Sequence, residues 1–83
     1  MTLDSRTTAH DDHVHDNTRR AGFAANTLLR HAELTGGTGE DLHTLLADLI
    51  GDLRHLTDLL GLDYAEIDER SHRYYQYELY GEL

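Results

Sequence analysis

The chain has 83 residues and no cysteine, so it can form one domain with a modest core that no disulfide or thiolate-bound metal reinforces. Sixteen acidic and seven basic residues give a net charge of −9, which argues against direct binding to the phosphate backbone of nucleic acids. No apolar run approaches the roughly 20 residues that span a bilayer, and the polar, acidic N-terminus does not resemble a signal peptide, so we expect a soluble cytoplasmic protein without membrane contacts.

The N-terminal segment 1–16 is rich in histidine and aspartate and carries few apolar side chains. It cannot offset the entropy lost on ordering, so we expect a flexible head. A first helix is predicted over about 17–35, with Asp16 or Asn17 as its N-cap. Gly36 and Gly37 predict its end, because glycine readily adopts the left-handed conformation at helix C-termini. Its apolar side is formed by Ala21, Ala24, Ala25, Leu28 and Ala32.

The second helix, predicted over about 39–60, has the strongest apolar pattern in the chain. Thr38 and Asp41 resemble a capping box at its start, and Gly61 followed by Leu62 predicts a Schellman motif at its end. Leucines spaced alternately by four and three residues form a heptad seam: Leu42, Leu46, Leu49, Leu53, Leu56 and Leu60. We call these six residues the leucine seam. Further apolar side chains widen it, namely Leu45, Ile50 and Leu59.

The third helix is predicted over about 64–80, with Asp63 and Glu66 as its N-terminal capping residues. All five tyrosines of the chain lie in this helix. Aromatic side chains with a polar hydroxyl suit surfaces that are partly buried and partly wet. We expect Tyr64 and Tyr74 to pack on the second helix. The remaining tyrosines either stay half-exposed or contact a partner: Tyr75, Tyr77 and Tyr80.

Together the three helices predict an all-α unit over residues 17–83. The first helix presents mainly alanines and the third mainly tyrosines. Together they offer less apolar area than is needed to cover the leucine-rich second helix. Soluble monomers rarely expose a wide apolar stripe. We therefore expect two copies to pair through the second helix as a dimeric helical bundle, with Leu49, Leu53 and Leu56 in the interface. A closed three-helix monomer is the alternative.

Histidines and aspartates raise the question of a metal site. An acid precedes a histidine by three residues at Asp12/His15, Glu40/His43, Asp52/His55 and Glu69/His72. Di-metal helical proteins use Glu-x-x-His at this spacing, but they also need inward-facing carboxylates on neighbouring helices, so we interpret these pairs as solvated polar faces. Asp48 and Asp52 lie four residues apart on one helix and could share a Mg²⁺ ion. A solvent-facing acidic side is the simpler interpretation.

Residues 46–75, LADLIGDLRHLTDLLGLDYAEIDERSHRYY, resemble the closing part of small MazG-like all-α nucleotide pyrophosphohydrolases. The segment is also similar to short helical proteins of actinobacteria and phages. The MazG-like resemblance implies a Glu-x-x-Glu motif on one helix and a Glu-x-x-Asp motif on the next. Only Asp48 matches, at the last position of the second motif, because Leu45 replaces its glutamate and Glu33 has no acidic partner at that spacing. The resemblance thus implies a scaffold that lacks most of the catalytic carboxylates.

These features favour a non-enzymatic acidic helical protein that binds a second copy and another protein, without a cofactor. The contact surface would be acidic or tyrosine-bearing. Small accessory proteins of mobile elements, such as antitoxins or inhibitors of bacterial defence systems, share this profile. The alternative is a Mg²⁺-dependent MazG-like pyrophosphohydrolase, or a degenerate relative, with Asp48 and Asp52 as metal ligands.

Overall fold

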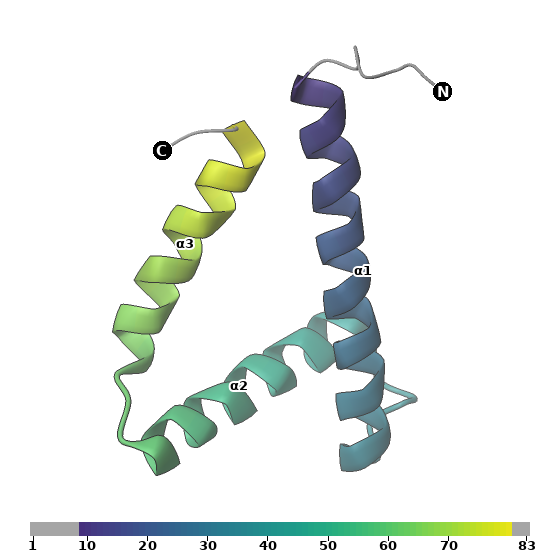
Figure 1. The fold of residues 1–83 in the computed structure, drawn as a ribbon. Helices are drawn as coiled ribbons and strands as arrows, with labels where there is room; N and C mark the ends of the chain where they lie inside the picture. Colours follow the sequence, from purple (N-terminus) through teal and green to yellow (C-terminus); the bar gives the residue numbers. More distant parts are fainter. Residues whose placement is uncertain (1–8, 81–83) are drawn as a thin grey trace.

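A computed structural model describes residues 9–80 as three helices joined by short turns (Figure 1). The helices are α1 (Ala9–Thr35), α2 (Leu42–Leu60) and α3 (Tyr64–Tyr80), and side chains are described from residue 15 to residue 80. The predicted all-α class with three helices is confirmed, and within 9–80 there is no strand. None of these helices is long and apolar enough to cross a membrane.

Helix α1 begins at Ala9, so the predicted start near residue 17, with Asp16 or Asn17 as N-cap, is wrong. The segment 9–16 offers little apolar area, but it contains neither glycine nor proline. A helix that has already formed extends easily, because each added residue gains a backbone hydrogen bond without a new nucleation step. The second half of the predicted flexible head is therefore helical, whereas residues 1–8 lie outside the described residues.

The end of α1 is the glycine stop that the sequence predicts. Gly36 has a φ of 77°, and the backbone N–H of Gly37 donates to the carbonyl of Ala32 at 2.8 Å. This six-to-one hydrogen bond is the mark of a Schellman motif. It satisfies a carbonyl that would otherwise have no partner at the helix terminus.

Helix α2 starts three residues later than predicted, because Asp41 and not Thr38 is its N-cap. The Asp41 carboxylate accepts a hydrogen bond of 2.8 Å from the backbone N–H of Thr44. This hydrogen bond lowers the pKa of Asp41 below its ordinary value. The stabilisation from the cap is therefore present above the ordinary aspartate pKa and is lost as the pH falls through the lowered one.

The turn from α2 to α3 also follows the predicted chemistry. Gly61 has a φ of 74°, and the backbone N–H of Leu62 donates to the Thr57 carbonyl at 2.8 Å, which confirms the Schellman motif. The Asp63 carboxylate then accepts from the backbone N–H of Ala65 at 2.9 Å. Asp63 thereby provides the predicted cap of α3, and the short turn sets the direction in which α3 leaves α2.

The three helices enclose an open triangle instead of a closed bundle (Figure 1). Helix α1 crosses the N-terminal end of α2, α3 rises from the opposite end, and the upper ends of α1 and α3 approach each other. The radius of gyration is 16.3 Å, whereas a compact domain of this length would have a value of about 12 Å. The alternative prediction of a closed three-helix monomer is therefore wrong for this chain.

The buried core is small and lies where α1 crosses α2. It consists of Leu28 and Ala32 from α1 and Leu45 from α2, with Leu49 packed partly against it. The other alanines expected on the inner side of α1 are exposed, namely Ala21, Ala24 and Ala25. The crossing thus covers only one short stretch of each apolar face.

Polar contacts join the upper ends of α1 and α3. The Asn17 side chain donates to the Glu78 carbonyl at 3.1 Å, and the Arg20 guanidinium lies 3.2 Å from the Glu78 carboxylate. An ion pair as exposed as this one contributes at most about 1 kcal/mol. These polar contacts at the third corner of the triangle thus converge on one residue, Glu78.

Candidate interaction surface

The leucine seam is largely uncovered in the folded chain. The buried residues of α2 are Leu45 and Thr57, which lie on either side of the seam and not within it. Five seam leucines remain 42–66% exposed: Leu42, Leu46, Leu53, Leu56 and Leu60. Leu53 lies about 80° around the helix from Leu45, so the crossing with α1 buries one edge of the apolar face and leaves its centre accessible.

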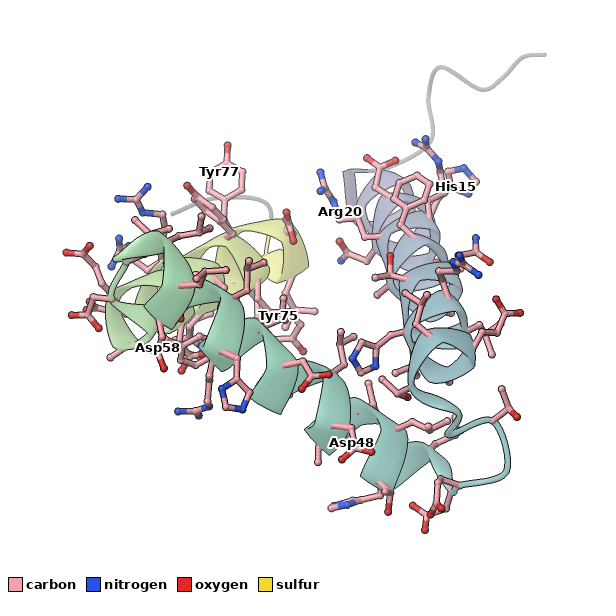
Figure 2. The ribbon with its side chains drawn as sticks, turned by 90° about the horizontal axis from the view of Figure 1, so that it is seen from below. His15, Arg20, Asp48, Asp58, Tyr75 and Tyr77 are labelled. Atoms are coloured by element: carbon pink, nitrogen blue, oxygen red, sulfur yellow. The ribbon has the colours of Figure 1, made fainter. Side chains whose placement is uncertain are left out.

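An acidic edge runs along α2 about 100° around the helix from the centre of the leucine seam. We use this name for Asp41, Asp48 and Asp52, whose spacings of seven and four residues place them within about 40° of one another on α2. Residues 40–63 contain six acidic residues and a single arginine, Arg54. The Arg54 guanidinium lies over the ring of Tyr64, 4.3 Å from its centroid. In Figure 2 Asp48 and Asp58 are seen on the face of α2 that is turned to the viewer. Negative charge therefore dominates this side of α2.

A hydrogen bond between His31 and Asp52 joins α1 to α2 beside the core. The His31 Nε2 and Asp52 Oδ2 atoms are 2.6 Å apart, and the His31 side chain is only 15% exposed. Because an ionised carboxylate can only accept, Nε2 carries the proton and donates. The Nδ1 atom of His31 is buried without a partner among the described residues. The pair therefore fixes both the orientation of the ring and the spacing of the two helices at the crossing.

Sequence reasoning missed this pair, because it considered only acids and histidines within one helix. His31 and Asp52 are 21 residues apart and meet only through the crossing of α1 and α2. No spacing pattern could have indicated the contact. The acid–histidine pairs that we interpret as solvated polar faces, Glu40/His43, Asp52/His55 and Glu69/His72, form no hydrogen bond within each pair, and Glu69 forms an ion pair with Arg73.

Asp48 and Asp52, the predicted metal ligands, have different surroundings. Asp52 is engaged by His31, whereas Asp48 is exposed and has no hydrogen-bond or ion-pair partner among the described residues. Within the part of the chain that has described side chains, no three histidine or acidic residues are grouped closely enough to hold a metal ion. A Mg²⁺ site at these two aspartates stays a prediction, and at most two protein carboxylates would form it.

We expect millimolar Mg²⁺ to leave the melting temperature unchanged. An ion that binds only the native state must raise this temperature, but Asp52 is engaged by His31, and Asp48 alone is a weak ligand for an ion that gives up its water reluctantly. Thermal denaturation followed by circular dichroism, with NaCl of equal ionic strength as the control, measures the effect. A rise that is specific to Mg²⁺ and is lost in Asp48→Asn would instead support the hydrolase alternative.

The tyrosines of α3 form a second exposed surface. Tyr75, Tyr77 and Tyr80 are 60%, 45% and 71% exposed, and Figure 2 shows Tyr75 and Tyr77 on opposite sides of α3. Tyr64 is half-buried beneath Arg54, but Tyr74 is 57% exposed, so the expectation that Tyr74 packs on α2 is wrong.

A shallow groove of about 500 Å³ runs along the start of α3 and is lined by Leu62, Asp63, Glu66, Ile67, Arg70, Ser71 and Tyr74.

The geometry defines a small all-α chain whose principal feature is the exposed leucine seam of α2. No protein-family model matches the chain, and neither a curated protein nor a solved structure shows significant similarity to it. The resemblance of residues 46–75 to MazG-like enzymes therefore stays an expectation. Inferences about function depend on the surfaces described above.

Proposed function

We propose that this chain is a non-enzymatic, acidic helical interaction protein that acts by binding other polypeptides. The observation that carries the proposal is the exposure of the leucine seam, where five leucines of one helix are at least 42% exposed. Burial of apolar surface is worth about 25 cal/mol per Å², so leaving this stripe in water is unfavourable. Contiguous apolar surface of this kind marks interaction sites in soluble proteins.

The first proposed partner is a second copy of the chain. Pairing of two α2 helices through Leu49, Leu53 and Leu56 would bury both seams in one step and give a dimeric helical bundle with two-fold symmetry. The heptad spacing suits this mode, because knobs from one helix fit holes on the other. The charge of −9 on each copy opposes the pairing, so added salt should strengthen it.

The second proposed partner is another protein in the cytoplasm. The exposed aromatic surface of α3, at Tyr75, Tyr77 and Tyr80, supports this proposal, because tyrosine contributes large contact area and a hydroxyl for hydrogen bonding. An accessory factor of a mobile element, of the antitoxin or defence-inhibitor type, is the class of protein with this profile. Such a protein would act by occupying its partner's surface.

Light scattering coupled to gel filtration tests the self-pairing. At micromolar concentration we expect twice the 9.5 kDa mass of one chain. Leu53→Ser should shift the protein toward the single-chain mass, because it places a hydroxyl in the middle of the seam. Leu29→Ser is the matched control, since Leu29 is also exposed, at 58%, but lies on α1. A single-chain mass for the unaltered protein would contradict the proposal.

A further inference from the structure

We propose that the closed triangle of helices blocks its own leucine seam, so that two copies pair only after the corner between α1 and α3 has opened. The inference rests on the proposed function, because it concerns the regulation of self-pairing through the same surface. It is carried by the direction in which the seam points, by the size of the opening that the helices enclose, and by the absence of buried residues over Tyr64–Tyr80.

The leucine seam points into the opening between α1 and α3. Figure 2 views the molecule from below, and Asp48 and Asp58 lie on the face of α2 that is turned to the viewer. Leu53, at the middle of the seam, is five residues from each of them and therefore lies about 140° around the helix from both. The seam thus faces upward, toward the space that α1 and α3 enclose above α2 in Figure 1.

The neighbours of α2 adjoin the seam on both sides. On one side Leu45 is buried against α1, and Asp52 accepts the hydrogen bond from His31. On the other side Arg54 lies over the ring of Tyr64, with which α3 begins. Because the upper ends of α1 and α3 also meet, the seam lies at the base of an opening that is bounded by all three helices (Figure 1).

The opening is too small to hold a second helix along the seam. Helix α2 has 19 residues and α3 has 17, so they are about 28 and 25 Å long, and α1 measures about 20 Å between its contacts with α3 and with α2. The centre of a triangle with these sides lies only about 7 Å from each helix axis. The axis of a helix packed on the seam must lie about 8–10 Å from that of α2, so this helix would overlap with α1 and α3.

The corner between α1 and α3 is the one that can open without loss of the core. The buried residues hold α1 to α2, and the turn at Gly61–Asp63 joins α2 directly to α3. Helix α3 has no buried residue over Tyr64–Tyr80, and its polar contacts with α1 include those of Glu78 with Asn17 and Arg20. A swing of α3 about the turn therefore leaves the core intact and makes the seam accessible to a second copy.

A cross-link across this corner tests the inference, since the chain has no cysteine of its own. The variant Asn17→Cys/Glu78→Cys is treated at high dilution with a short bis-maleimide, and the product linked within one chain is isolated by its mass under denaturing conditions. The same variant blocked with N-ethylmaleimide is the matched control. By light scattering we expect the single-chain mass of 9.5 kDa for the linked protein and twice that mass for the blocked protein.

A milder change at the same corner should strengthen self-pairing. Glu78→Gln removes the ion pair with Arg20, whereas Glu66→Gln changes the net charge equally in the first turn of α3, away from the corner. Because exposed ion pairs are weak, we expect Glu78→Gln to lower the Kd of the dimer by about two- to fivefold relative to Glu66→Gln. Sedimentation equilibrium measures the Kd, and circular dichroism verifies that the helix content of each variant is unchanged.

The outcomes separate this inference from the proposed function. A dimer of the linked protein would overturn the inference, because the closed triangle would then pair, and the self-pairing would stand. A single-chain mass for the blocked protein beside a dimer of the unaltered chain would also overturn it. If the cross-link does not form within one chain, the corner is not closed in solution and the inference fails. If the unaltered, blocked and Glu78→Gln proteins are all monomers, the self-pairing fails as well.

Discussion

Replacing Leu45 with alanine should lower the free energy of unfolding by about 2–5 kcal/mol, the largest effect of any leucine in α2. Leu45 is 5% exposed and packs against Leu28 and Ala32 at the crossing with α1. Its truncation would leave a cavity in a core of three buried apolar residues, which has few other side chains able to fill it. Urea denaturation followed by circular dichroism measures the loss.

Leu53→Ala is the matched comparison for this experiment. Leu53 is 42% exposed in the single chain, so its truncation should cost about 1 kcal/mol when the protein is dilute enough to be monomeric. The same substitution should weaken self-pairing, because Leu53 lies in the middle of the seam. If Leu53→Ala matched Leu45→Ala in the dilute protein, the principal core would lie in the seam and not at the crossing.

Asp52→Ala should cost about 1–3 kcal/mol more than Asp48→Ala. Both substitutions replace an exposed aspartate of α2 by alanine, so the gain in helix propensity is similar and cancels in the comparison. Only Asp52 accepts the hydrogen bond from His31 across the crossing, at 2.6 Å. Its removal leaves the Nε2–H group of a mostly buried ring without a partner, and this loss of hydrogen bonding is the source of the difference.

Thermal denaturation of the two variants measures this difference, and a double-mutant cycle with His31→Ala assigns it to the pair. A coupling energy near zero would show that the two side chains act independently. The sequence alone predicts that both carboxylates are expendable, since both lie on the polar side of α2. The comparison therefore separates the effect expected from the position of each aspartate on α2 from the effect of the hydrogen bond formed at the crossing.

The turns of this chain could be predicted because each depends on a few neighbouring residues. Gly36 and Gly61 adopt the left-handed conformation at the ends of α1 and α2, and Asp63 caps α3 as its position before the helix indicates. The start of α1 could not be placed in the same way, since the segment 9–16 has no apolar stripe and its candidate cap, Asp16, lies inside the helix. There the helix continues from its neighbour and depends little on the local side chains.

The core and the candidate surface depended on information that periodicity does not contain. The pattern of α2 shows which face is apolar, but the angle at which α1 crosses decides that Leu45 is buried and Leu53 is not. The same crossing brings His31 to Asp52 over a separation of 21 residues. The exposure of the seam follows from the shortage of apolar area on α1 and α3, which the sequence did indicate. The sequence did not indicate which residues of α2 are covered.

The contacts of Glu78 with Asn17 and Arg20 join the corner of the triangle at which the ends of α1 and α3 meet. Both contacts are polar and reach across the ends of α1 and α3, and none of the buried side chains in the described part of the chain lies there. Release of this corner exposes no apolar core, so it can occur by local opening while the crossing of α1 and α2 stays intact. Widening the angle between α1 and α3 therefore costs polar contacts, one of which is an exposed ion pair that added salt weakens.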